Sequence, residues 1–253
     1  MTDLFDETQR KLYSVICRHD GIKAKDIARI TGTERSDINR LLYANPFVHE
    51  LCCRDDEYLW HGLIRQDRPH AGLEDFCGYY GTADRFTAQS EEEWLAELKK
   101  GCRGIGRNLN DTRGLFHSFL DCRNVMRTLF QDLAAMSAGS FQDWEIVFEL
   151  RINRARMIRI YADVLVIMPG KVFSLEFKMK NSIDPDEVLQ AAKYCPFLEV
   201  IFGPRFEIFP ALVLTSASEL FEFVSIGETD MLLPVSSGDM LFNVFNEYLG
   251  FLA

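Results

Sequence analysis

The sequence IYADVLVIMPGKVFSLEFK, residues 160–178, decides the fold that we predict for this chain. It contains two apolar runs, residues 160–168 and 172–177, which have the length of β-strands. Proline followed by glycine separates the runs, and this pair is typical of a tight turn. The stretch therefore predicts a β-hairpin. A turn longer than two residues would shift the pairing of its strands.

The predicted hairpin brings charged side chains together on one face. We pair Met168 with Lys171 across the turn. In this register Asp163 lies opposite Glu176, with Cβ atoms about 4.5–5.5 Å apart, and Lys178 shares the face of Glu176. Two carboxylates within an apolar sheet need neutralisation, and Mg²⁺ or Mn²⁺ prefers such hard oxygen ligands. The alternative is an ion pair of Lys178 with Glu176 and a solvated Asp163.

Helical and extended patterns alternate through the rest of the C-terminal region. An apolar stripe at helical spacing predicts a long helix over residues 113–136. Asp184 followed by Pro185 begins a second helix, which we expect to run to Leu198. Further strands are predicted over residues 144–150, 207–214 and 221–226, and a terminal helix over residues 239–252. This order predicts an α/β fold with a mixed sheet flanked by helices.

Three motifs of this region resemble those of a known nuclease superfamily. Asp163, twelve intervening residues and then Glu176-Phe177-Lys178 resemble the active-site hairpin of the PD-(D/E)xK nucleases. Residues 190–194, QAAKY, are similar to the QxxxY motif of the RecB-like branch. Residues 114–120, GLFHSFL, are similar to the first motif of that branch. The resemblance covers residues 110–215 and implies a restriction-endonuclease-like fold.

The resemblance also implies a metal-dependent nuclease that acts on DNA. The implied catalytic residues are Asp163, Glu176, Lys178, Gln190 and Tyr194. The implied ligands of Mg²⁺ or Mn²⁺ are Asp163, Glu176 and His117 of the first motif. Gln190 and Tyr194 stand four residues apart and therefore share one helix face. Glu145 and Glu149, which share one face of the first predicted strand, are the alternative acidic contributors.

The chain departs from the RecB-like pattern in three respects. Some members hold an iron–sulfur cluster through one upstream cysteine and three near the C-terminus. Here Cys195 is the only cysteine after residue 122, so no iron–sulfur cluster is expected. Ala162 precedes Asp163, where the branch commonly has proline or a glycine-aliphatic pair. The chain contains no Walker motif, so any unwinding of DNA must come from a partner.

Residues 1–65 resemble a winged helix-turn-helix domain. Helices are predicted over residues 6–19, 23–32 and 36–45, and short strands over residues 47–53 and 57–63. In such a domain the third helix faces the major groove of DNA, which would present Arg35, Asn39 and Arg40. Glu34 and Asp37 offset the charge of these arginines. The alternative is a winged helix that binds only protein.

The domain boundaries follow from these patterns. We predict a winged-helix domain over residues 1–65, a connector over residues 66–109 and a nuclease-like domain over residues 110–253. Within the connector, Ser90 followed by three glutamates predicts the start of a helix by capping-box logic. This helix is expected to reach about Lys100, where a group of glycines ends it. These glycines are Gly101, Gly104 and Gly106.

The charge distribution bears on the expected partner. The formal net charge is −10, and the acidic excess lies mainly in residues 161–253. All basic residues between positions 112 and 160 are arginines, and among them Arg154 and Arg156 are candidate phosphate contacts. Non-specific attraction to DNA should be weak at this net charge. We therefore expect specific contacts with DNA, and the sequence leaves a protein partner or a homodimer open.

The composition excludes several classes of protein. Hydrophobic residues make up 47% and charged residues 26%, which excludes a disordered or collagen-like chain. No apolar run reaches the roughly 18–20 residues of a membrane span, so no membrane partner is expected. The N-terminal segment is acidic and lacks a signal-peptide core. Seven cysteines without a CxxC spacing suggest reduced thiols and a cytoplasmic location.

Two other functions remain open from the sequence. The first is a winged-helix DNA-binding regulator whose second domain keeps a nuclease fold without catalysis. The complete set of Asp163, the Glu176–Lys178 motif and the 190–194 motif argues against it, because a dead site should lose a member. The second is an interaction protein with no role at nucleic acid, which the acidic C-terminal third favours.

Overall fold

The computed structural model describes residues 7–19, 21–44, 48, 52–62, 72–107, 109, 112–136, 141–152, 160–227 and 229–251. The chain forms two compact units. The N-terminal unit comprises Met1–Glu74, Arg151–Tyr161 and Pro196–Phe206. The sheet unit comprises Asp75–Leu150, Ala162–Cys195 and Glu207–Ala253. Within the described ranges, no helix is long and apolar enough to cross a membrane.

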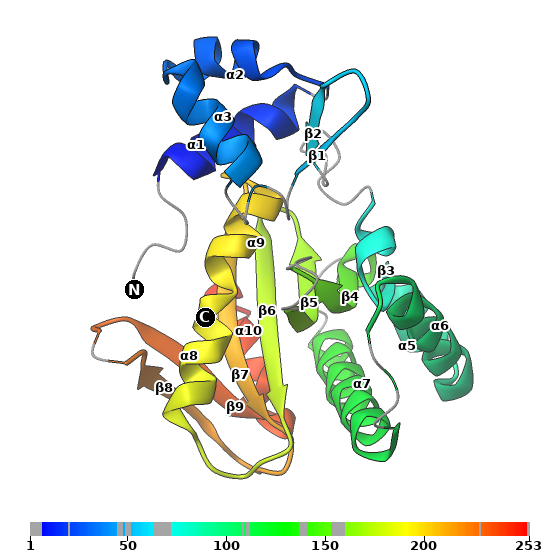
Figure 1. Cartoon of the computed structure of the whole chain (residues 1–253). Coiled ribbons are helices and arrows are strands. Elements are labelled where there is room, and N and C mark those ends of the chain that lie inside the picture. Colours follow the sequence, from blue (N-terminus) through cyan, green and yellow to red (C-terminus); the bar gives the residue numbers. More distant parts are fainter. Residues whose placement is uncertain are drawn as a thin grey trace. The chain divides into compact units, whose positions relative to one another are not determined.

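Among its described residues, the N-terminal unit contains helices and then a two-stranded antiparallel sheet, in the order predicted from the sequence (Figure 1). These elements are α1 (Glu7–Arg18), α2 (Ala24–Thr31), α3 (Arg35–Ala44), β1 (Cys52–Arg54) and β2 (Trp60–Gly62). Gly32 ends α2 with a left-handed φ of 68°, which favours glycine. The buried side chains of the N-terminal unit include Leu12, Ile16, Ile27, Ile38, Leu42 and Trp60. Helix α9 (Cys195–Phe202) lies largely in the same unit.

The sheet unit is built on a seven-stranded mixed sheet in the order β3-β4-β5-β6-β7-β9-β8. Its strands are β3 (Tyr79–Thr82), β4 (Glu145–Arg151), β5 (Tyr161–Met168), β6 (Lys171–Lys178), β7 (Glu207–Leu214), β8 (Phe221–Ser225) and β9 (Leu232–Ser237). β5 is antiparallel to β6, whereas β6, β7 and β9 run parallel. The predicted α/β class with a mixed sheet is confirmed.

Helices cover both faces of this sheet (Figure 1). They are α5 (Ala83–Ala88), α6 (Glu91–Gly104), α7 (Thr112–Ala135), α8 (Pro185–Lys193) and α10 (Leu241–Leu249). Three 3₁₀ turns are η1 (Leu73–Phe76), η2 (Phe141–Asp143) and η3 (Gly238–Met240). One apolar cluster joins α5, α6, α7 and α10 to the sheet, and a second joins α8 to β7 and β9. β7 serves both clusters, because Val213 points into the first and Leu212 into the second.

The hairpin of β5 and β6 has the register predicted from the sequence. Met168 pairs with Lys171, and Val164 pairs with Leu175. On β6, Leu175 and Phe177 point into the first apolar cluster. Because side chains alternate along a strand, Glu176 points to the opposite face, which α8 covers. The hairpin thus presents its charged residues to α8.

The glycine-rich end of α6 differs from the sequence prediction. Ser90 forms the predicted capping box with Glu93, but α6 continues through Gly101 to Gly104. A Cβ at Gly101 would lie 2.1 Å from the carbonyl oxygen of Gly78, just before β3. Gly101 therefore permits close packing of the helix against the sheet and does not end the helix.

The predicted connector, residues 66–109, also differs from the structure. Its described residues from Asp75 onward belong to the sheet unit, and β3 is an edge strand that pairs with β4. The sequence left residues 72–81 open between a loop and a short strand, because the four residues of β3, YYGT, show neither a run nor an alternation of apolar side chains.

Two further boundaries differ in the C-terminal region. The helix predicted to reach Leu198 divides into α8 and α9, and Pro196 stands in the first turn of α9, where a missing N–H is tolerated. β9 was not predicted, because Pro234 interrupts its apolar residues. β9 nevertheless pairs with strands on both sides.

Candidate active site

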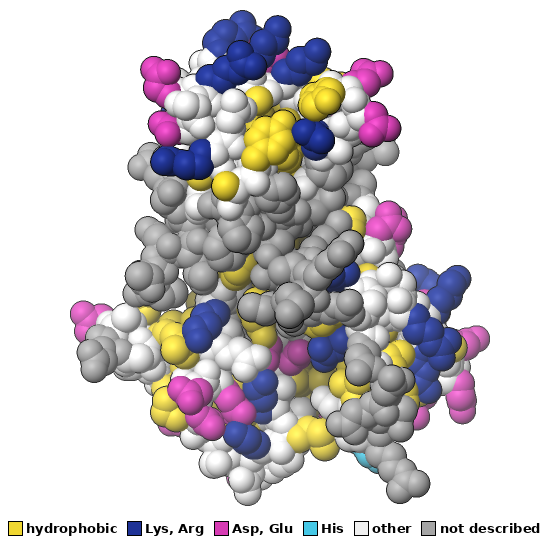
Figure 2. All heavy atoms as spheres, in the orientation of Figure 1, with side chains coloured by type: hydrophobic (Ala, Val, Ile, Leu, Met, Phe, Trp, Pro, Cys, Tyr) yellow, Lys and Arg dark blue, Asp and Glu magenta, His cyan; other side chains and the backbone are white. Residues whose placement is uncertain are grey.

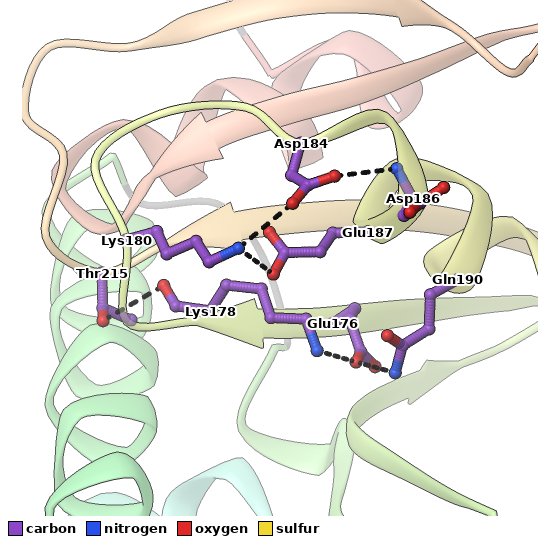
Figure 3. Close-up of polar contacts among 8 residues, drawn as sticks. All are labelled: Glu176, Lys178, Lys180, Asp184, Asp186, Glu187, Gln190 and Thr215. Carbon is purple, nitrogen blue, oxygen red and sulfur yellow. Dashed lines mark hydrogen bonds and ion pairs between the residues drawn. The ribbon is translucent and has the colours of Figure 1, made fainter.

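Glu176 is the centre of a polar cluster between β6 and α8 (Figure 3). Its Oε1 accepts a hydrogen bond of 2.8 Å from Nζ of Lys178 and one of 2.7 Å from Nε2 of Gln190. The Glu176 side chain is only 3% exposed and that of Lys178 22%. The second carboxylate oxygen of Glu176, Oε2, is buried without a hydrogen-bond partner. A buried acceptor of this kind is available to a cation.

Helix α8 delivers two of the predicted residues to this cluster. Asp184 caps the helix by accepting a hydrogen bond from the backbone N–H of Asp186, and Pro185 occupies the first turn. Gln190 projects toward β6, where it contacts Glu176. Its Nε2 also lies 2.8 Å from the hydroxyl of Tyr194. Burial raises the pKa of Tyr194, so the phenol stays protonated. The helix thus holds an amide and a phenol beside Glu176.

Asp163 lies at the end of the paired part of the hairpin. Its Oδ2 accepts a hydrogen bond of 2.9 Å from the backbone N–H of Phe177. This bond ties β5 to β6 beyond the pair of Val164 with Leu175. Burial raises the pKa of Asp163, although the Phe177 N–H and the charge of Lys178 act in the opposite direction. Asp163 and Glu176 are close enough that the charge of Asp163 raises the pKa of Glu176.

Burial and neighbouring charges shift the pKa values of the cluster. Burial first, and the charge of Asp163 second, raise the pKa of Glu176 to about 8. Burial lowers the pKa of Lys178, but the charge and hydrogen bond of Glu176, together with the charges of Asp163 and Glu187, outweigh burial, and the pKa rises. Lys178 is therefore a positive charge at neutral pH beside carboxyl groups that resist ionisation. A divalent cation would favour the ionised form of those carboxyl groups.

Glu149 on β4 belongs to the same electrostatic environment. Burial and the charge of Asp163 raise its pKa to about 8, and Glu176 contributes in the same direction. Nε of Arg107 lies 2.9 Å from Oε2 of Glu149. The sequence named Glu149 only as an alternative contributor, and it gave no signal for Arg107, which follows α6 at a turn.

A second ionic group lies nearer the start of α8, where the side chains of Lys180 and Asp184 are exposed and that of Glu187 is half-buried (Figure 3). Nζ of Lys180 lies 3.2 Å from Asp184 and 2.7 Å from Glu187. The hydroxyl of Thr215 donates a long hydrogen bond of 3.5 Å to the backbone oxygen of Lys178. These contacts stabilise the segment between β6 and α8, and none of them involves Glu176.

His117 is not gathered with the other predicted metal ligands into a three-ligand group. His117 is exposed on α7. Among the residues that the structure describes, no three His, Cys, Asp or Glu side chains are gathered in a position to hold a metal ion. The set of His117, Asp163 and Glu176 is therefore not gathered as a three-ligand group. Hydrogen bonds join Glu176, Lys178, Gln190 and Tyr194, and Asp163 lies within electrostatic reach of Glu176.

The predicted nucleic-acid contacts of the N-terminal unit lie on α3. Arg35 and Arg40 are exposed and Asn39 is half-buried. Nη2 of Arg40 lies 3.1 Å from Oδ1 of Asp37, so part of its charge is offset within the helix. Lys and Arg side chains gather at the top of the view in Figure 2, over the segment that contains α2. Arg154 and Arg156 lie outside the described residues.

Comparisons with protein-family models, with curated proteins and with solved structures found no match.

Proposed function

We propose that the protein is a metal-dependent nuclease of the PD-(D/E)xK type that hydrolyses phosphodiester bonds in DNA. The observation that carries this proposal is the contact of both Lys178 and Gln190 with one oxygen of Glu176. A structural ion pair would need only the lysine. The added amide and the unpartnered Oε2 are the arrangement expected of a carboxylate that is oriented for a ligand.

Asp163 and Glu176 would hold the metal ion, Mg²⁺ or Mn²⁺. Both present carboxylate oxygens, which these ions prefer, and the buried Oε2 of Glu176 lacks a partner. When bound, the ion would lower the pKa of a water molecule and stabilise negative charge on the phosphate. The sequence motif resembles the nuclease hairpin at the same residues.

The remaining residues of the cluster would position the reacting groups and neutralise the charge that develops on them. Lys178 would orient the attacking water and offset the charge that develops as the water oxygen bonds to phosphorus and the P–O bond to the leaving oxygen breaks. Gln190 would keep the Glu176 carboxylate in one orientation, and Tyr194 would hold Gln190 in place. The proton released by the water would pass to solvent, and the leaving oxygen would take up a proton from solvent.

The N-terminal unit would recognise the substrate. Its three helices and two strands support the proposal of a winged-helix domain, with Arg35, Asn39 and Arg40 on the helix that would meet DNA. Since Asp37 offsets Arg40, we expect recognition through particular contacts and not through strong general attraction. A protein partner or a second copy of the chain would be a further source of selectivity.

The test is cleavage of supercoiled, linear duplex and single-stranded DNA in the presence of Mg²⁺, Mn²⁺ or EDTA. We expect cleavage with metal and none with EDTA. Glu176→Gln should abolish it while keeping the shape of the side chain, and Lys178→Ala should reduce it by about 10²–10³-fold, as loss of a charge-stabilising group does. Cleavage that resists EDTA, or that survives in Glu176→Gln, would contradict the proposal.

Lys180→Ala is the matched control. Lys180 follows Lys178 by two residues, but it is exposed and contacts Asp184 and Glu187 instead of Glu176. Its loss removes one positive charge from the same segment, so a general electrostatic effect would appear in both variants. We expect Lys180→Ala to cleave at the wild-type rate.

A further inference from the structure

Glu149 has a buried carboxyl group that the proposed reaction does not use. Its side chain is 5% exposed, and β4 lies next to β5, which carries Asp163. The pKa of Glu149 responds to the charges of both Asp163 and Glu176, so the three carboxyl groups lie within electrostatic reach of one another. A third acid in such a place costs free energy that an apolar residue would not.

The backbone at Glu149 is also strained. Its φ is 56°, in the left-handed region that a non-glycine residue rarely adopts, although it lies within a strand. Such a conformation is unfavourable for a non-glycine residue and persists where the surroundings impose it. Gly78 packs closely here, since a Cβ on it would lie 3.2 Å from Cβ of Glu149. Backbone strain and a buried carboxyl group at the same residue point to a function for its side chain.

Arg107 is held against Glu149 by the way α6 ends. The backbone N–H of Arg107 bonds to the carbonyl of Cys102, and that of Gly106 to the carbonyl of Arg103. With Gly106 at a φ of 70°, these two bonds form a Schellman motif, which fixes the residue that follows the helix. The arginine is therefore placed at Glu149 by backbone geometry.

We propose that Glu149 is the third carboxylate of the metal site and that Arg107 is its counter-ion until a divalent cation displaces it. This inference rests on the proposed metal-dependent function. It replaces the role that the sequence resemblance implies for His117, which is exposed. Among the described residues, no three ligating side chains are gathered for a metal ion. In this proposal the reason is that the guanidinium of Arg107 engages Glu149.

The guanidinium of Arg107 and the metal ion then compete for the carboxylate of Glu149. In the absence of metal, Arg107 neutralises Glu149 at a separation of 2.9 Å. In its presence, Oε2 of Glu149 would turn from the guanidinium to the ion that Asp163 and Glu176 also hold. Arg107 is therefore a positioning residue. Its removal should raise the affinity for the metal ion and lower the stability of the metal-free protein. A purely structural ion pair would not couple to the metal at all.

The experiment is calorimetric titration of the full chain with Mn²⁺ in the absence of DNA. We expect Glu149→Gln to weaken Mn²⁺ binding by about 10–100-fold. Arg107→Gln should tighten it by about tenfold, because the competing cation is gone. His117→Ala should leave it unchanged. Arg103→Gln, an exposed arginine in the last turn of α6, is the control and should also bind as the wild type does.

Thermal unfolding supplies a second readout. In EDTA, Arg107→Gln should unfold at a lower temperature than the wild type, because Glu149 loses its partner. Mn²⁺ should then raise its unfolding temperature by more than it raises that of the wild type. An equal loss of stability with and without Mn²⁺, together with unchanged affinity, would mean that the ion pair is only structural and would overturn the proposal. Should Arg107→Gln not fold, Glu149→Gln alone decides, since unchanged affinity in that variant overturns it too.

The outcomes separate this inference from the proposed function. If the wild type binds no Mn²⁺, both fail. If the wild type binds and Glu176→Gln does not, the proposed metal site stands. In that case, wild-type affinity in Glu149→Gln overturns the role of Glu149 alone. A tenfold loss in His117→Ala with none in Glu149→Gln would assign the third position to the histidine.

Discussion

The side-chain amide of Gln190 donates a hydrogen bond of 2.7 Å to Oε1 of Glu176. The two residues stand on different elements, Gln190 on α8 and Glu176 on β6, so the packing of the helix on the sheet sets the orientation of the carboxylate. In the proposed reaction this contact matters as much as the ligand itself, because an outer hydrogen bond fixes which oxygen is left for the metal.

The first prediction concerns this contact. Gln190→Ala should lower the rate of metal-dependent DNA cleavage by about 10–100-fold, the usual cost of losing an outer-shell partner. The expected cause is a carboxylate that samples several orientations, so Mn²⁺ affinity should fall together with the rate. Lys193→Ala, an exposed position on the same helix, is the control and should cleave normally. A normal rate in Gln190→Ala would show that the amide serves only to pack the helix.

The second prediction concerns pH in the absence of metal. Burial and neighbouring charge raise the pKa of Glu176 from an ordinary value of 4.5 to about 8. Between those values the folded protein keeps a proton that the unfolded chain has lost, so unfolding releases a proton. The stability that protonated Glu176 contributes is therefore complete below about pH 4.5 and is lost as the pH rises toward 8.

The measurement is the unfolding temperature in EDTA between pH 5 and pH 8. The wild type is compared with Glu176→Gln, because the two proteins share all other titratable groups. The wild type should become less stable across this range, and Glu176→Gln should show a shallower fall because it cannot ionise. Mn²⁺ should restore the stability of the wild type at the alkaline end, since it favours the ionised carboxyl groups. Parallel curves for the two proteins would contradict the assigned cause.

The hairpin of the candidate site could be predicted from the sequence because its signals are local. A Pro-Gly turn and two short apolar runs determine the pairing, and the structure pairs Met168 with Lys171 as expected. α8 was equally predictable at its start, where Asp184 caps it. The face shared by Glu176 and Lys178 then follows from strand alternation alone.

The other parts of the site depend on contacts between distant segments. Nothing in the local sequence of Arg107 indicates that the turn after α6 places it 2.9 Å from Glu149 on β4. The left-handed φ of Glu149 is likewise imposed by its neighbours and not by its own preference. His117 stays a prediction of the local motif, and its side chain is exposed on α7.

The third prediction concerns the N-terminal unit. Replacing both Arg35 and Arg40 by alanine should change which DNA is cleaved, or where, by more than it changes turnover on saturating DNA. The reason is that Asp37 offsets Arg40, so general phosphate attraction by α3 is small and its contribution must come through particular contacts. Mapping cleavage positions on a long duplex gives the answer. Tight binding of random duplex DNA by residues 1–65 alone at physiological salt would contradict it.

The last prediction compares two glycines of α6. A Cβ at Gly101 would lie 2.1 Å from the carbonyl oxygen of Gly78, whereas one at Gly104 would meet nothing within 4 Å. Gly101→Ala should therefore lower the free energy of unfolding by about 3 kcal/mol, since backbone must move. Gly104→Ala should change it by at most about 1 kcal/mol, in the stabilising direction. Because α6 leads into Arg107, only Gly101→Ala should also alter Mn²⁺ affinity, and equal effects of both substitutions on stability and affinity would contradict this coupling.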